Sequence, residues 1–170
     1  SNPKAPYGVK RLDQALEGAM TFGYYQVPTP DNEIGQYRYN GSDLKNRPML
    51  WSGPLIYHEL APGHHFQINL NMENESIHKI RKDMRLYNAS ITEGWGNYAA
   101  FLAEEIGMLD ELLDQYGWVV FQMFFYNRLV LDTGMNALGW SLEDARAFMR
   151  KYTFATEAEI QTETLRYSVD

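Results

Sequence analysis

Residues 57–67 read Tyr57-His58-Glu59-Leu60-Ala61-Pro62-Gly63-His64-His65-Phe66-Gln67 and contain three of the chain's four histidines beside one glutamate. Neutral imidazoles are common zinc ligands, and a carboxylate next to a ligand histidine is left free to accept a proton from water. The pattern therefore predicts a hydrolytic zinc site in which His58 binds the metal and Glu59 is the catalytic base. We expect this motif to lie on a helix from about residue 54 to residue 71.

Proline at position 62 must disturb this helix. In a regular helix, a second ligand four residues after His58 would lie on the same face, one turn away, but Pro62 occupies that position. Proline cannot donate to the carbonyl of residue i−4, and its ring crowds that carbonyl. The helix is therefore expected to bulge or break, and Gly63 gives the backbone the freedom to do so.

Two choices of second ligand follow from this bend. If a bulge absorbs the extra residues, His64 turns back towards His58 and is the second ligand. If the helix stays nearly regular, His65 shares the face of His58 but lies about 10.5 Å along the axis at roughly 1.5 Å per residue. The geometry favours His64, with His65 as the alternative ligand or as a residue that faces the substrate.

The third ligand is predicted from Thr92-Glu93-Gly94-Trp95-Gly96, where Thr92 is the candidate cap of a new helix. The small residues Gly94 and Gly96 would let this helix approach the histidine helix as closely as a Zn–O bond of about 2.0–2.2 Å requires. Two histidines and Glu93 would leave one position on the metal open for water, which is typical of a catalytic site. The structural alternative is that Glu93 is a first-turn acid that suits the helix dipole.

The rest of the chain predicts a mainly α-helical domain with a short β strand or hairpin before the metal-binding helix. Apolar spacing predicts helices over residues 10–22, 92–107 and 109–132. Residues 36–40 alternate and are aromatic, so they are the predicted strand. Ser141 and Thr156 are each followed three residues later by an acid, which indicates a helix start. The side chains expected in the core of the long apolar run are those of Met123, Phe124 and Phe125.

Composition limits the classes of function. The net charge is −7 and the Lys and Arg residues are scattered, which does not suit a nucleic-acid partner. No apolar run approaches the roughly 20 residues needed for a transmembrane segment. Because the chain has no cysteine, any metal must be bound by His, Asp, Glu and water. We expect a single metal-binding catalytic domain over residues 1–170.

Beyond the histidine motif and Glu93-Gly94-Trp95, the chain contains Arg128-Leu129-Val130-Leu131-Asp132-Thr133-Gly134-Met135, Gly139-Trp140-Ser141, Glu163 and Arg166-Tyr167. In this order the motifs resemble the bacterial DUF885 proteins, a group similar to the gluzincin metallopeptidases. The resemblance implies a helical zinc-metallopeptidase-like fold, a zinc site on the two motif helices and Glu59 as catalytic base. Family chains are considerably longer. The resemblance therefore also implies that this chain is the C-terminal catalytic portion of a longer protein, whose N-terminal part completes the cleft. It further implies an exported or periplasmic location.

Gluzincin-like sites usually add a group that stabilises the oxyanion of the intermediate. Tyr167 and Arg166 are the candidates for this catalytic role, because both carry hydrogen-bond donors at the end of the chain. The alternative is structural: Tyr167 packs in the core, and Arg166 pairs with Glu163 one turn away.

Asp132 and Asn136 are candidates for support of the site from outside the ligand set. Asp132 either orients a ligand histidine or pairs with Arg128 at i, i+4. The family commonly has a histidine where this chain has Asn136, which can hydrogen-bond but cannot titrate near neutral pH. The predicted strand at Tyr37–Tyr39 would offer an edge for an extended peptide or would simply cover the core.

The expected function is zinc-dependent hydrolysis of peptide bonds, as in a metallopeptidase of the carboxypeptidase or dipeptidase type, with a peptide or small amide as substrate. Glu59 would remove a proton from water and deliver it to the leaving amine. One alternative is a metal-dependent amidohydrolase that acts on a small substrate. The other is an inactive metal-binding scaffold domain, a reading that Asn136 keeps open.

Overall fold

The computed structural model describes residues 2–47, 49–82 and 89–169, and it is mainly helical with one small sheet, as the sequence predicts. The strands are β1 (Tyr7–Arg11), β2 (Gly23–Gln26) and β3 (Gly35–Tyr39). The first helices are η1 (Met49–Trp51), α1 (Ser52–Glu59), α2 (His64–Glu73) and η2 (Lys79–Arg81). They are followed by α3 (Ala89–Glu105), α4 (Leu112–Leu138), α5 (Leu142–Tyr152) and α6 (Glu157–Tyr167).

The sheet has the strand order β1-β3-β2, with β1 parallel and β2 antiparallel to β3. The predicted strand is confirmed as β3, but it is the central strand. The expectation that Tyr37–Tyr39 offers a free edge to a peptide is therefore wrong, because both edges of β3 are already paired. Strand β2 lies at an edge of the sheet, and three of its residues border the cavity described below.

The predicted helix over residues 10–22 is wrong. Its first residues belong to β1, and residues 14–19 form turns. The apolar residues here do not form one buried helix face, because Leu12 is buried whereas Leu16 is exposed. The backbone N–H of Leu12 donates to the carbonyl of Tyr39 at 2.8 Å instead of taking part in a helix. Arg11 and Glu17 form an ion pair across the turn at 2.8 Å. Contacts with a distant strand thus override a local helical pattern.

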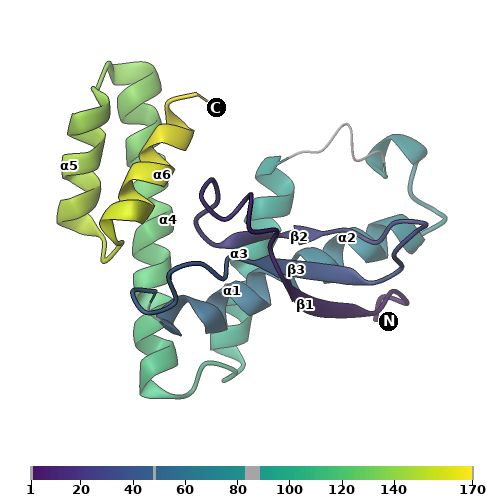
Figure 1. The fold of residues 1–170 in the computed structure, drawn as a ribbon. Coiled ribbons are helices and arrows are strands. Elements are labelled where there is room, and N and C mark those ends of the chain that lie inside the picture. The colour runs from purple at the N-terminus through teal and green to yellow at the C-terminus, as the bar shows by residue number, and fades with distance from the viewer. Residues whose placement is uncertain (1, 48, 83–88, 170) are drawn as a thin grey trace.

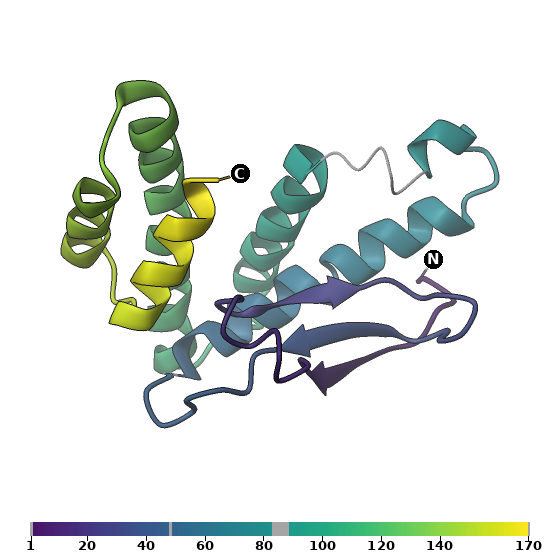
Figure 2. The same cartoon turned by 45° about the horizontal axis from the view of Figure 1, so that its top comes forward.

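The elements form two groups, which Figures 1 and 2 show from two directions. In the first, α1 and α2 lie along one face of the sheet and α3 packs against them. The second group consists of α4, α5 and α6. The long helix α4 joins the groups, since it contacts η1 and α1 as well as α5 and α6. Each group therefore supplies a wall to the space between them.

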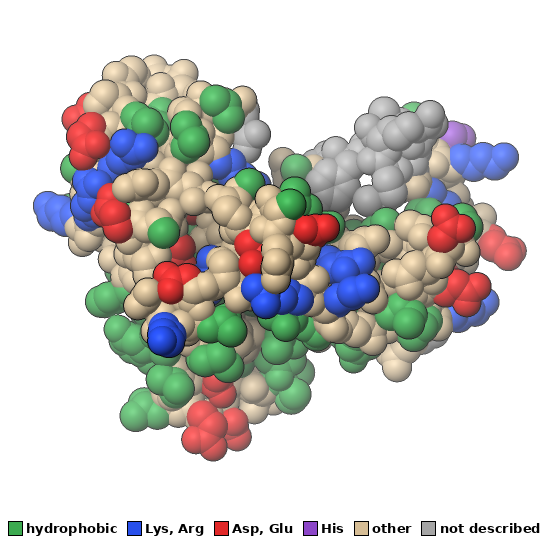
Figure 3. All heavy atoms as spheres, in the orientation of Figure 1, with side chains coloured by type: hydrophobic (Ala, Val, Ile, Leu, Met, Phe, Trp, Pro, Cys, Tyr) green, Lys and Arg blue, Asp and Glu red, His purple; other side chains and the backbone are tan. Residues whose placement is uncertain are grey.

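The core follows α4. Phe124 is fully buried, as predicted, and Phe125 packs against the core from a partly buried position, whereas Met123 is only half-buried. Trp51 of η1 packs edge-on against Phe124, with ring centroids 5.2 Å apart. Hydrophobic side chains also gather on the surface at the lower end of the view in Figure 3. The turn from α3 to α4 and the first residues of α4 expose Ile106, Met108, Leu112, Leu113 and Tyr116.

Helix starts are confirmed where the signal is local. Ser141 and Thr156 each cap a helix in a full capping box, and the partner acids are Asp144 and Glu159. Thr92 is not the cap of α3. That helix already includes Ala89, and Thr92 is buried within it. The residues just before Ala89 lie outside the described part of the chain.

A buried ion pair joins α6 to α4 and to the segment before β2. Glu163 is 1% exposed, and Arg128 donates from Nη2 to its Oε2 at 2.9 Å. The hydroxyls of Thr21 and Tyr167 also donate to Glu163. Burial alone would raise the pKa of the Glu163 carboxyl, but the charge of Arg128 and these hydrogen bonds lower it below its ordinary value.

We expect this pair to make stability fall in acid. Because the folded-state pKa of Glu163 is below the unfolded value of about 4.3, its contribution is complete above that pH and is lost as the pH falls through the folded pKa. Glu163→Gln should flatten the acid limb of the stability curve. It should also cost about 3 kcal/mol or less at neutral pH, a penalty reduced because the side chain of Arg128 is 26% exposed.

Urea unfolding across the acid range measures this effect. Glu143→Gln is the matched control, because Glu143 pairs with Arg150 at 3.0 Å on an exposed surface of α5. An acid limb that is equally steep in Glu163→Gln and in the unmodified protein would contradict the assignment.

Candidate metal centre

The site begins with a break between α1 and α2. Pro62 has no N–H to donate to the carbonyl of His58, so α1 ends at Glu59 and α2 begins at His64. Gly63 lies so close to this carbonyl that a Cβ atom would fall 1.8 Å from the oxygen of His58. Only glycine fits at this position, and the close approach brings the ring centroids of His58 and His64 to 4.6 Å.

Two hydrogen bonds hold the break in place. The N–H of Phe66 donates to the carbonyl of Leu60 at 3.3 Å, across the interruption. The indole Nε1 of Trp95 on α3 donates to the carbonyl of Pro62 at 2.8 Å. The break is thus fastened to the same helix that carries Glu93.

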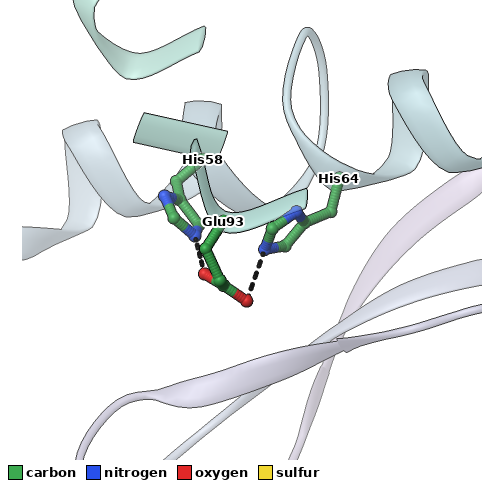
Figure 4. Close-up of side chains that lie close together, drawn as sticks. All are labelled: His58, His64 and Glu93. Carbon is green, nitrogen blue, oxygen red and sulfur yellow. Dashed lines mark hydrogen bonds and ion pairs between the residues drawn. The ribbon is translucent and has the colours of Figure 1, made fainter. Parts of the chain in front are cut away.

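The structure brings His58, His64 and Glu93 together, as Figure 4 shows. Nε2 of His58 lies 3.2 Å from Oε2 of Glu93, and Nε2 of His64 lies 3.6 Å from Oε1. One ligand atom from each residue falls within 4.8 Å of the others. Two ligands bound tetrahedrally to zinc at about 2.0–2.2 Å lie roughly 3.3–3.5 Å apart. The two N···O distances are close to this value, so small movements of the side chains would bring all three residues around one metal ion.

Packing, more than hydrogen bonding, fixes the ring of His58. Gly96 of α3 lies under it, and a Cβ atom there would fall 2.7–2.9 Å from three ring atoms. Phe125 of α4 stacks on the ring with a centroid distance of 5.8 Å and an angle of 27°. The expected clearance at Gly96 is found, whereas Gly94 faces open space. Nδ1 of His58 and Nδ1 of His64 are buried without a hydrogen-bond partner among the described residues.

The charges of the three residues suit a metal. Burial would raise the pKa of Glu93, but hydrogen bonds and charge from the two histidines hold it well below its usual range. Burial lowers the pKa of His58, and this effect outweighs the hydrogen bond to Glu93. For His64 burial also acts to lower the pKa, but Glu93 and Glu59 raise it overall. An anionic carboxylate facing two ring nitrogens is a common donor set for zinc.

Glu59, the predicted base, lies beside this cluster on the last turn of α1. Its side chain is buried, and Oε2 has no hydrogen-bond partner in the described parts of the chain. Burial raises the pKa of Glu59 to about 7, while the charge of His64 and the backbone of Tyr25 oppose the rise. The carboxyl group is therefore placed to exchange a proton near neutral pH.

His65 points away from the cluster. Its Nε2 lies 3.1 Å from the carbonyl of Ala5, which can only accept, so Nε2 carries the hydrogen and Nδ1 is the acceptor. The hydroxyl of Tyr25 lies 2.9 Å from Nδ1, and Asn69 donates to that hydroxyl at 2.9 Å. Both ring nitrogens of His65 are thus engaged in fastening β2 and the N-terminal segment to α2, and His64 takes the position next to His58.

A cavity of about 750 Å³ opens over the site. Its lining residues come from the segment 19–27, from α1, α2 and α3 on one side, and from α4 and α6 on the other. His58, Glu59, His64 and Glu93 all border it. The site is therefore a lined chamber between the two groups of elements, of the size that holds a small ligand or part of a peptide.

Of the two predicted oxyanion donors, Arg166 borders this cavity and Tyr167 does not. The hydroxyl of Tyr167 donates its hydrogen to Glu163 and accepts from Nε of Arg128 at 2.8 Å. The side chain of Tyr167 is buried. Glu163, offered above as a partner of Arg166, forms its ion pair with Arg128 instead.

Asp132 and Asn136 contact each other at 2.8 Å on the exposed side of α4, and Asn136 also donates to the carbonyl of Tyr167 at 3.1 Å. Neither has a recorded contact with His58 or His64 in the described chain. Phe125 marks where α4 meets His58, and Asp132 follows seven residues later, about 10.5 Å along the helix. That separation explains why Asp132 does not orient a histidine here.

Two neighbours of the site were not assigned to it from the sequence. Phe125 was expected in the core, but its ring also forms one wall of the His58 pocket. Arg128 was considered only as a partner of Asp132, but it borders the cavity. The charge of Arg128, placed within an apolar helical run, was the available signal, because a charge in such a place needs a partner or a ligand.

Fold and site together define a mainly helical protein with a cluster of two histidines and one glutamate that can hold a metal ion. The family described as bacterial protein of unknown function (DUF885) matches residues 1–170, and the chain belongs to this family. The resemblance noted in the sequence is confirmed at that level.

A crystal structure from Colwellia psychrerythraea, of a protein described as a candidate lipoprotein, is similar to this chain. The sequence identity is 32%, the TM-score is 0.90, and the match covers 99% of the present chain. The chain spans 29% of the length of that structure. No curated protein matches the chain. Among the described helices, none combines the length and hydropathy needed to cross a bilayer.

The packing of Gly96 under His58 generates a prediction. Gly96→Ala should push the imidazole out of line and lower the affinity for added Zn²⁺ by roughly 10- to 100-fold, the range found when groups that orient ligands are lost. Gly94→Ala is the matched control, since it adds the same methyl group to the same helix but in open space. Isothermal titration with Zn²⁺ measures both variants. Equal affinities in the two would show that His58 does not bind the ion.

Proposed function

We propose that this protein is a zinc-dependent hydrolase of peptide bonds, with His58, His64 and Glu93 as the metal ligands. The observation that carries the proposal is the position of Glu59, a buried carboxyl group next to a ligand histidine and on the wall of the same cavity. A structural zinc site closes all its ligand positions with protein atoms, whereas a catalytic site leaves one for water or substrate. Three protein ligands and a cavity support the catalytic kind.

Zinc, when bound, supplies a Lewis acid that polarises a carbonyl group and makes a water molecule more acidic. In the proposed reaction, Glu59 accepts a proton from the attacking water and then donates it to the nitrogen of the leaving amine. Oε2 of Glu59 has no hydrogen-bond partner among the described residues, so it is available to accept this proton. His58 is held rigidly between Gly96 and Phe125, which fixes the reacting geometry.

Arg166 remains the candidate that stabilises the oxyanion, because it borders the cavity from α6. Tyr167 supports this wall from behind, since its hydroxyl is held by Arg128 and Glu163. Of the two candidates, only Arg166 is therefore proposed to contact the substrate directly, and Tyr167 is not.

An extended substrate has a place to lie along β2. This strand forms the edge of the sheet, and Gly23, Tyr24 and Tyr25 all border the cavity. Extended peptides commonly add to such an edge through backbone hydrogen bonds. β2 thus takes the role that the sequence had suggested for Tyr37–Tyr39.

A small amide is the second candidate substrate. The volume of about 750 Å³ falls within the range of cavities that enclose small ligands, roughly 300–1,000 Å³. The described chain is 29% as long as its similar structure, so other parts of a parent protein would help to decide substrate length. Comparing hydrolysis of an N-acetyl amino acid with that of peptides of increasing length would separate the two substrates.

The description of the Colwellia protein supports a location outside the cytoplasm for the present chain. That location agrees with the exported or periplasmic one that the family resemblance implied. Fractionation of the native host cell, followed by immunoblotting of each fraction, would test it.

The first expected result concerns metal content. The purified protein supplied with zinc should contain about one zinc per chain, and His58→Ala should lose it because one of three ligands is removed. Inductively coupled plasma mass spectrometry measures both. His78→Ala is the matched control, since His78 lies on an exposed segment and its Nδ1 accepts from the N–H of Ile80 at 3.2 Å. Zinc retained in His58→Ala would overturn the ligand set.

The second expected result concerns the base. Glu59→Gln keeps the size of the side chain but cannot accept a proton, so kcat should fall by roughly 10²- to 10⁴-fold while zinc content is unchanged. Glu73→Gln, at the C-terminal end of α2, is the control, because Glu73 accepts hydrogen bonds only from the backbone of Lys4 and Ala5 within the described residues. Full turnover in Glu59→Gln would exclude this mechanism. Zinc binding with no hydrolysis of any substrate would favour an inactive scaffold.

A further inference from the structure

Arg128 is a charged side chain that the proposed reaction does not use. It rises from α4, and its Cζ atom lies 4.9 Å from the ring centroids of both Phe124 and Phe125. It also borders the cavity that contains the metal cluster. An arginine held over aromatic rings at the wall of a substrate cavity is a candidate for binding an anionic group.

One side of the guanidinium is already occupied. Nε donates to the hydroxyl of Tyr167 at 2.8 Å, and Nη2 donates to Glu163 at 2.9 Å. These two nitrogens form the side-on fork of arginine. Glu163 is in turn held by Thr21, so the guanidinium is fixed from α6 and from the segment before β2.

The other side of the guanidinium is available. Nη1 has no hydrogen-bond partner within the described ranges, and the side chain is 26% exposed at the cavity. Nη1 and the second hydrogen of Nη2 form an end-on pair of donors. This pair matches the two oxygens of a carboxylate, whereas a neutral carbonyl has only one oxygen to offer.

The pairing of Arg128 leaves room for a second anionic partner. Glu163 accepts one hydrogen bond from Nη2, and Nη1 donates none among the described residues. An ion pair with a purely structural role would need only Glu163, and it would not need a free pair of donors at the cavity.

The distance between Arg128 and the metal cluster limits where the carboxylate lies in the substrate. Phe125 separates the two sites, with its centroid 5.8 Å from the ring of His58 and 4.9 Å from Cζ of Arg128, so they lie within about 11 Å of each other. One extended residue spans about 3.3–3.6 Å. A carboxylate held between Arg128 and the cluster has its carbon about 4 Å from Cζ, so about 7 Å or less remains to the cluster, and the carboxylate would follow the cleaved bond by one or two residues.

We propose that Arg128 binds the terminal carboxylate of the substrate, so that the enzyme releases one or two residues from the carboxyl end of a peptide or cleaves an N-acyl amino acid. This inference rests on the proposed hydrolase function and names its substrate class. Arg128 is a binding residue here, and Glu163 and Tyr167 are the residues that position it.

The test compares a short peptide with a free carboxyl end and the same peptide with an amidated end, using the zinc-loaded protein. The value of kcat/KM should favour the free acid by roughly 10- to 100-fold, as expected for a charged hydrogen-bonded contact. In Arg128→Lys, which keeps a charge for Glu163 but loses the fork, this preference should fall towards one, mainly through KM.

Further variants keep the result interpretable. Arg128→Gln combined with Glu163→Gln removes both charges together, and it should also lose the preference if Arg128→Lys proves unstable by circular dichroism. Arg146→Gln is the matched control, because Arg146 pairs with Glu143 on α5 at 3.7 Å and is not among the residues that line the cavity. A preference that survives in both Arg128 variants, or that is lost in Arg166→Gln alone, would overturn the assignment.

A binding measurement separates this inference from the proposed function. Zinc-loaded Glu59→Gln should bind the free-acid peptide more tightly than the amide by calorimetry, with no turnover required. If hydrolysis proves independent of Glu59 but this binding preference depends on Arg128, the proposed mechanism fails and the carboxylate site stands. Equal binding of the two peptides would overturn the carboxylate site alone. If the protein cleaves an N-acetyl amino acid but not the peptide, the carboxylate that Arg128 binds belongs to a small N-acyl amino acid and not to the end of a peptide.

Discussion

The close approach of Gly63 to the carbonyl of His58 is the contact on which the metal cluster depends. Pro62 cannot continue the hydrogen bonds of α1, and the space beside the carbonyl admits no side chain larger than the hydrogen of glycine. The chain therefore turns sharply between two helices, and His64 faces His58 across the turn. Trp95 then ties the turn to α3, so that the helix that carries Glu93 is held against the same point.

Helix α4 contributes both an aromatic and a polar contact beside the cavity. Phe125 presents its ring to His58, while Arg128, one turn further along α4, binds Glu163 of α6. Thr21 extends this network to the segment before β2. One helix, α4, thus carries both the ring that packs on His58 and the arginine that borders the cavity. The distance between these two side chains is therefore fixed by their spacing along the helix.

Local features of this protein could be predicted from sequence, and those set by distant contacts could not. The caps at Ser141 and Thr156 need only four consecutive residues, so their signals were sufficient. The grouping of the histidines with Glu93 is the exception, because it is a contact between separate helices; it was predicted from the chemistry of the donor set and from the ordered motifs of the family, and no local pattern specifies it. The false helix over residues 10–22 and the partner of Tyr167 were decided by residues far along the chain, which no periodic pattern records.

Two carboxylates in one cavity have opposite electrostatic surroundings, and the contrast bears on their roles. Glu93 faces two imidazoles that hold its pKa well below the usual range, so it stays anionic as a ligand should. Glu59 is buried with one oxygen unpartnered, and its pKa is raised to about 7. Burying such a group costs free energy that an apolar residue at the same position would not. A structural metal centre gives no reason for this cost, whereas the proposed proton transfer by Glu59 would account for it.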